Sequence, residues 1–327
     1  ATANNGKFIG VLEGTKWADK LRQERAQKLW EFIQSFSPKE ISKLKSKSQV
    51  QDYLNNLSEN QIRELFDNLK EKYGRDIFGQ GWLYRIVSQD EIADVEKLTD
   101  DEKLNGIKGK KTFVPYDKGD KDGNRWWAPT PYYIDWSREN VKVLQTDPKA
   151  RWQGYQFYFR EGFCWSDIHT KFIKCRIKES GIHDVKSMSL FSLDENKYPD
   201  FYFVTIINST FVSEYVEAFI KNAQTFQIND ARQLPIIIPT PEQLKEFELI
   251  FDRAKRVQEE KFSGSKQKYL QMGKHQLQTN QTNNRQSVFG ADLQPLCSST
   301  NHQPFCSTVN RQPFLRRCRS YHNAHPH

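Results

Sequence analysis

Positive side chains and flat aromatic rings gather in one short segment of this chain, KGDKDGNRWWAPTPYYIDWS (118–137). Its cations stand among glycines and small polar residues, and tryptophans and tyrosines follow closely. Such cations can contact phosphates or guanine edges, and exposed rings can stack on bases. The pattern indicates a nucleic-acid surface. A purely structural alternative remains open, in which the rings fill a β-rich core and the lysines are solvated.

Motifs for self-contained catalysis are missing from the sequence. It has no G-x-x-x-x-G-K-[ST] phosphate loop, no G-x-S-x-G elbow and no H-E-x-x-H pair, and no glycine-rich cofactor loop follows an expected strand. Asp194 and Glu195 are followed by Asn, Lys, Tyr and Pro, which favours a solvated turn over a catalytic pair. Asp117, Asp120 and Asp122 alternate like calcium ligands, but the later Glu that closes such a loop is lacking. We therefore predict no catalytic and no metal-binding residues.

Charge and composition constrain the function only weakly. The 327 residues carry a net charge of +8, but the segment from Lys274 onward contributes +5 of it. Five irregularly spaced cysteines suggest no disulfide framework, and no signal peptide is visible. The longest apolar run, FYFVTII (201–207), is far shorter than the ~20 residues that span a bilayer. We expect a soluble, cytoplasmic protein with no membrane partner.

Hydrophobic spacing and turn residues divide the chain into regions that differ in expected secondary structure, and together these regions predict an α/β (α+β) fold. Strands are expected at Trp82–Val87, Arg125–Trp136, Gln153–Phe159 and Phe201–Ile207, and a short helix at Val212–Asn222. The predicted regions are a helical segment (1–75), a mixed β-rich domain (76–240), a long C-terminal helix (241–272) and a disordered low-complexity tail (273–327).

Capping patterns locate several helix ends. Ser37-Pro38-Lys39-Glu40 and Ser58 with Gln61 predict helix starts, and Gly74 predicts a stop. The joint INDARQLPIIIPTPEQL (228–244) predicts a stiff strand, at a sheet edge or beside a bulge, that leads directly into the long helix, because its prolines cannot donate ladder hydrogen bonds. The residues of this structural joint are Pro235, Pro239 and Gln243.

The tail is rich in Gln, Asn, Ser, Thr and His, and NHQPF (301–305) is nearly repeated as NRQPF (310–314). A zinc site is conceivable there, but no standard ligand spacing appears. A non-native or out-of-frame tail is an equal alternative. The residues concerned are Cys297, His302, Cys306, Cys318, His322, His325 and His327.

An ordered series of segments resembles the target-recognition region of adenine-specific (N6) DNA methyltransferases of the type IIG restriction–modification and BREX phage-defence groups. The likeness runs in order through residues 76–262. Its last element also resembles the joint that leads into the conserved helix of type I specificity subunits. The segments are PYDKGDKDGNRWW…YYIDWS (115–137), FYFREGFCWSDI (157–168), DVKSMSLF (184–191), IINSTFVSEYVEAF (206–219) and TFQINDARQLPIIIPTPEQL (225–244).

The resemblance implies sequence-specific binding of double-stranded DNA. It also implies S-adenosylmethionine as the cofactor of the complete enzyme, which flips its target adenine out of the duplex. The family's glycine-rich cofactor motif and its N-P-P-[YFW] motif are both absent here. We therefore expect a fragment or subunit that works with a methyltransferase catalytic domain and binds no cofactor itself.

Charge and position within the resembling segments select the expected DNA contacts, with the tryptophans as wedges or stacks. They are Lys118, Lys121, Arg125, Trp126, Trp127, Arg151, Arg160, Lys171, Lys174 and Arg176.

Two further hypotheses remain open. The chain could be a protein-interaction scaffold that pairs through the apolar stripe of its long C-terminal helix, with the aromatics merely forming a core. It could also be an active methyltransferase with degenerate motifs, which would bind S-adenosylmethionine by itself.

Overall fold

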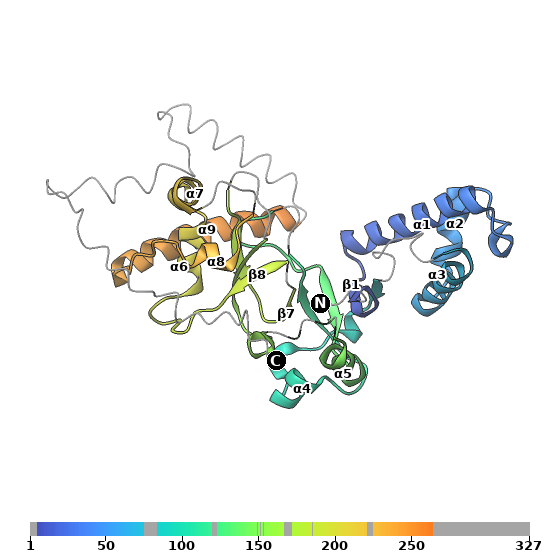
Figure 1. Ribbon diagram of the computed structural model, residues 1–327, viewed down its shortest axis with the longest axis horizontal. Coiled ribbons are helices and arrows are strands. Elements are labelled where there is room, and N and C mark those ends of the chain that lie inside the picture. Colours follow the sequence, from blue (N-terminus) through green and yellow to red (C-terminus); the bar gives the residue numbers. More distant parts are fainter. Residues whose placement is uncertain are drawn as a thin grey trace, which may run out of the picture. The chain divides into compact units, whose positions relative to one another are not determined.

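The structure of the chain is a computed structural model (Figure 1). The fold is α+β, as predicted, with helices near the N-terminus, mixed sheets and a long C-terminal helix. The predicted tail lies outside the described residues. The structure describes residues 5–74, 84–119, 123–148, 150, 152, 154–166, 172–184, 186–220 and 225–263.

The chain divides into two compact units that interleave along the sequence, here called unit 1 and unit 2. The predicted recognition region 76–240 contributes residues to both. Unit 1 holds the residues up to Asp117 together with Thr130–Phe159 and Ser180–Asp184, and unit 2 holds Lys118–Pro129, Arg160–Glu179 and the residues from Val185 onward.

Unit 1 begins with a helical group that has its own core, which includes Leu29, Phe32, Val50 and Phe66. The group lies at the blue, N-terminal end of the chain in Figure 1. The predicted capping box at Ser58 is present. Its elements are η1 (Asn5–Phe8), α1 (Lys16–Phe36), η2 (Lys39–Ile41), α2 (Lys47–Asn55) and α3 (Glu59–Tyr73).

The start predicted at Ser37 is wrong, because Ser37 instead closes α1 in a left-handed conformation and donates its backbone N–H to the Ile33 carbonyl. The chain then makes only the short turn η2. The stop predicted at Gly74 is confirmed: its φ of +124° suits glycine, and its N–H bonds the Lys70 carbonyl at the end of α3.

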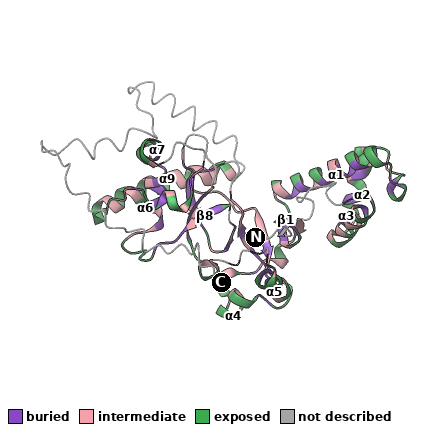
Figure 2. Ribbon diagram, viewed as in Figure 1, coloured by how far each residue is buried: buried purple, intermediate pink, exposed green. Residues whose placement is uncertain are grey.

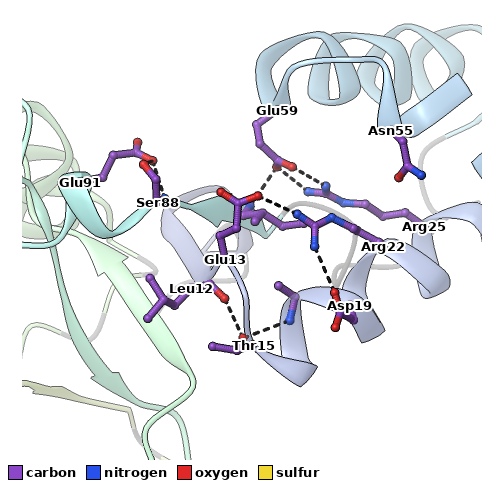
Figure 3. A network of polar contacts seen from close by, with 12 residues as sticks. Leu12, Glu13, Thr15, Asp19, Arg22, Arg25, Asn55, Glu59, Ser88 and Glu91 are labelled. Atoms are coloured by element: carbon purple, nitrogen blue, oxygen red, sulfur yellow. Dashed lines mark hydrogen bonds and ion pairs between the residues drawn. The ribbon is translucent and has the colours of Figure 1, made fainter. Parts of the chain in front are cut away.

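A partly buried ion pair joins the helical group to strand β2 (Arg85–Val87) of the neighbouring sheet (Figure 3). Arg25, only 4% exposed, makes two 2.9 Å bonds to the carboxylate of Glu59. Arg25 also donates to the Tyr84 carbonyl, and Glu59 accepts the backbone N–H of Ile86 at 3.0 Å. Because both charges are paired and bonded to backbone, their burial does not leave an uncompensated ion.

The sheet of unit 1 has five strands in the order β2–β1–β4–β3–β7. β1 runs parallel to β2 and antiparallel to β4, which is antiparallel to β3; β3 and β7 are parallel. Ile9, Val114, Ile134 and Trp136 lie in its core. The remaining elements of unit 1 are β1 (Ile9–Leu12), β2 (Arg85–Val87), η4 (Gln89–Glu91), η5 (Val95–Lys97), α4 (Asp100–Asn105), β3 (Phe113–Asp117), β4 (Tyr132–Asp135), α5 (Arg138–Thr146), η6 (Tyr155–Phe157) and β7 (Ile182–His183).

Unit 2 is built on a three-stranded antiparallel sheet in the order β6–β5–β8. Helix α6 packs on β5 and β6, and α9 packs on α6. Exposed and half-buried residues alternate along α9 (Figure 2). The elements are β5 (Gly162–Ser166), β6 (Cys175–Lys178), β8 (Ser187–Leu190), α6 (Asp200–Ile207), α7 (Thr210–Tyr215), the π-helical turn η7 (Val216–Ile220), α8 (Ile228–Ala231) and α9 (Pro241–Phe262).

Three strand predictions are wrong. Residues 201–207 form α6, which is apolar on nearly every face because it lies between a sheet and another helix. The described residues of 153–159 form a 3-10 turn. The segment 235–239 belongs to no sheet. The short helix predicted at 212–222 exists as α7 continued by η7.

The proline-framed joint is nevertheless anchored. Leu234 is 7% exposed at its start, and the hydroxyl of Tyr202, on α6, donates to the Ile237 carbonyl. The predicted capping box then opens α9, where the hydroxyl of Thr240 accepts the Gln243 N–H at 3.3 Å. The joint therefore ties α9 to α6, not to a sheet edge.

Within the described residues, no helix is both long enough and apolar enough to span a bilayer.

Candidate nucleic-acid interface

The loop that carries the predicted cations and tryptophans is hydrogen-bonded to strand β6. The N–H of Trp126 donates to the Cys175 carbonyl at 2.8 Å, and Ile177 donates to the Trp126 carbonyl at 3.0 Å. Trp126 has a φ of +72°, which is unusual for a residue with a side chain and marks a constrained backbone. The loop thus extends the sheet of unit 2 beyond β6.

A buried asparagine, Asn208, connects this loop, β6 and the end of α6. Its side chain makes a two-way bond with the backbone of Cys175: Nδ2 donates to the carbonyl at 2.8 Å, and Oδ1 accepts the N–H at 2.9 Å. Oδ1 also accepts from Nε of Arg125 at 3.3 Å, and the Asn208 carbonyl accepts a second Arg125 bond. Asn208 is only 3% exposed, so it acts as a clamp shielded from water.

Two of the predicted contacts are core residues. Trp126 is 7% exposed, and its ring lies 6.4 Å from that of Phe251 on α9. Arg176 is 4% exposed on β6. We correct both predictions: a ring packed inside the core cannot wedge between bases, and a guanidinium this deeply buried cannot reach a groove in this conformation.

Arg125 is half-buried and donates hydrogen bonds to Asn208. Burial lowers the pKa of its guanidinium below the usual value. Its bonds to Asn208 give it a structural task, so its removal would disturb the loop as well as any DNA contact.

Trp127 keeps a partly open position. Its indole N–H donates to Glu179 at 3.0 Å, and its ring meets Phe262 edge-to-face at 6.0 Å. The side chain is half-buried, which leaves part of the ring accessible.

The cations that remain accessible lie beside the loop and along the sheet. Lys174 is half-buried and runs against Gly123, where an added Cβ would lie 2.7 Å from its Nζ. Arg160 is exposed, stands 5.5 Å from the centre of the Phe191 ring and donates to the Ser192 carbonyl at 3.3 Å. Lys118 is half-buried. The predicted contacts Lys121, Arg151 and Lys171 lie outside the described residues.

Charge within unit 2 is divided between its strand-and-loop half and its helical half. The described residues of 118–129 and 160–179 include six Lys or Arg, of which Arg176 and Lys178 are buried, against two Asp or Glu, whereas those of 186–263 include eight against twelve. A polyanion such as DNA would therefore favour the strands and loops over the helices.

The sequence reasoning missed two residues of this region. The sequence shows Asn208 as a polar residue at the end of an apolar run, but it does not show which groups Asn208 bonds. Lys178 is 3% exposed, and its ammonium bonds the Arg160 and Glu179 carbonyls at 2.8 and 3.2 Å. An alternating strand pattern gave no sign that a lysine would be buried.

The carboxyl of Asp200, at the start of α6, is 7% exposed, and its Oδ1 has no hydrogen-bond partner among the described residues. Burial, aided by the carboxylate of Glu195, raises its pKa to about 7. In the described part of the chain, no group of His, Cys, Asp and Glu side chains is arranged to hold a metal ion.

No known family model matches the chain, and a search of curated proteins gives no match either.

Proposed function

We propose that this chain is the target-recognition part of an S-adenosylmethionine-dependent, adenine-specific DNA methyltransferase of a restriction–modification or phage-defence system. In this proposal it binds double-stranded DNA through the strand-and-loop half of unit 2. A separate catalytic domain or subunit supplies the cofactor site and the methyl transfer.

The observation that carries the proposal is the meeting of two resembling segments, 115–137 and 206–219, with strand β6 at Asn208. The loop 123–127, the strand β6 and the Asn-Ser turn after α6 are far apart in sequence, yet the side chain of Asn208 in the turn bonds both the loop and the strand. Such a clamp would hold the basic loop at a fixed place on the sheet, as a surface that reads bases requires. The excess of cations in the same half of the unit supports it further.

Packing in unit 2 weakens the scaffold hypothesis. The stripe expected to pair with another chain contacts the core of this chain instead, which leaves it less available to a partner. The stripe residues that pack there are Leu244, Phe247, Ile250, Phe251 and Ala254.

DNA binding is tested best on cations of the strand-and-loop half that take no part in the Asn208 clamp. We predict that Lys118→Ala and Lys174→Ala in combination weaken duplex binding about tenfold at low salt and reduce the slope of log affinity against log salt by about 2, one for each lost phosphate contact. Fluorescence anisotropy with a labelled duplex over a salt series measures both quantities.

Lys245→Ala combined with Arg253→Ala is the matched control, because the pair also removes two positive charges, from exposed positions on α9 in the acidic half of unit 2. It should leave the affinity unchanged. A wild-type chain without salt-dependent duplex binding would refute the proposal. Calorimetric titration with S-adenosylmethionine should give no heat; a binding signal would favour the degenerate methyltransferase instead.

A further inference from the structure

Three aromatic rings in unit 1 form a stack that runs from the core to the surface. Trp136 is fully buried, Trp152 is half-buried and Tyr155 is 41% exposed. The ring centres of Trp136 and Trp152 are 5.7 Å apart with a 9° angle between planes, and those of Trp152 and Tyr155 are 6.0 Å apart with 17°. The rings are therefore nearly parallel and offset, the arrangement that aromatic systems favour.

The inner end of the stack is fixed by neighbouring groups. The indole N–H of Trp136 is 3.1 Å from the carbonyls of Glu102 and Lys103. Tyr158 stands nearly perpendicular to both tryptophans, at 83° and 89°. Burial raises the pKa of Tyr158 to about 12, which shows how far this supporting ring is removed from water.

A short rigid turn places Tyr155 at the outer end. Gly154 has a φ of +82°, in the left-handed region that glycine favours, and the 3-10 turn η6 follows. The Phe157 N–H closes the turn on the Gly154 carbonyl at 2.9 Å. Among the described residues, the ring of Trp152 is the only one that stacks on Tyr155, and the Tyr155 hydroxyl makes no hydrogen bond.

We propose that Tyr155 is a stacking site for an unpaired nucleobase, which would add a fourth ring to the series. A preformed stack suits such a ligand because the partner rings are already ordered, so binding costs little side-chain entropy. The choice of a nucleobase over another planar ring rests on the proposed function.

The test is a titration of the full chain with a short single-stranded deoxyadenosine oligonucleotide, followed by tryptophan fluorescence. A base stacked on Tyr155 should quench the emission in a saturable way. Tyr155→Ala should weaken this binding about tenfold, which corresponds to a loss of about 1.4 kcal/mol. Tyr155→Phe keeps the ring and should stay within about twofold of the wild type.

Phe219→Ala is the control for a general loss of exposed aromatic surface, since Phe219 is 75% exposed in unit 2. It should bind like the wild type. Equal binding by wild type and Tyr155→Ala, or no quenching in the wild type, would overturn the inference. If the duplex still binds with the expected salt dependence, only this inference fails; if duplex binding is also absent, the proposed function fails with it.

Discussion

At the scale of single residues, Asn208 has the clearest structural task. It satisfies a backbone N–H and a carbonyl of Cys175 in the interior of unit 2 and bonds Arg125 as well. We predict that Asn208→Ala lowers the free energy of unfolding by about 3 kcal/mol, because it leaves two buried backbone groups without partners. Urea unfolding measures this loss.

Asn229→Ala is the matched control for the clamp. Asn229 is exposed in the same unit and accepts one bond from Arg232. Its loss should cost no more than about 0.5 kcal/mol. If the two variants were equally stable, Asn208 could not be the clamp that orders the loop.

Asp200 predicts a dependence of stability on pH. The pKa of its carboxyl in the folded chain is about 7, against about 3.9 for an ordinary aspartate. Between about pH 4 and pH 7 the folded chain therefore keeps a proton that the unfolded chain has released, so this group lowers stability as pH rises through that range. Glu195 and Glu161 are the neighbouring carboxylates that add to the effect of burial.

Asp200→Asn should remove this contribution, since an amide cannot ionise. We expect a variant that is more stable than the wild type by on the order of 1–2 kcal/mol at pH 8 and little different near pH 4. Urea unfolding over a pH series measures the difference. Asp194→Asn is the control, because Asp194 is an exposed aspartate of the preceding turn, and its stability should depend on pH as that of the wild type does. If Asp200→Asn also showed the wild-type dependence on pH, burial would not perturb the carboxyl of Asp200.

At the scale of elements, the sequence predicted most of the helix ends that local interactions decide, although the start expected at Ser37 was wrong. The capping boxes at Ser58 and Thr240 and the stop at Gly74 involve residues a few positions apart, and all three are present. The apolar run 201–207 was misread as a strand because a helix buried on several faces has no amphipathic period. The joint at 235–239 was misread because its contacts, above all that with Tyr202, come from a distant element.

The candidate site was less predictable than the helices. Sequence position identified the loop and its cations, but burial decided which of them stay accessible. Trp126 and Arg176 are buried by packing against α9 and by pairing across the loop, neither of which has a local signature. The Tyr155 stack likewise joins a strand end to a later turn, so only the folded chain brings its rings together.

At the scale of the whole molecule, the two units are built from interleaved stretches of chain, so neither is a continuous segment. Strand β1 lies between β2 and β4 in the sheet of unit 1, yet it comes from residues 9–12. Helix α9 covers α6 in unit 2, yet it begins only at Pro241. The recognition region defined from composition, 76–240, therefore lacks one inner strand and one covering helix.

We predict that a fragment of residues 76–240 does not fold as a domain. Without β1, strand β2 loses its partner and β4 exposes an unpaired edge, and without α9 the apolar residues of α6 face water. The full chain should unfold cooperatively with strong near-ultraviolet circular dichroism, whereas the fragment should show neither property and should aggregate through its exposed strand edges. A soluble fragment with a cooperative transition would mean that β1 and α9 are accessories, and that the recognition surface can be studied without them.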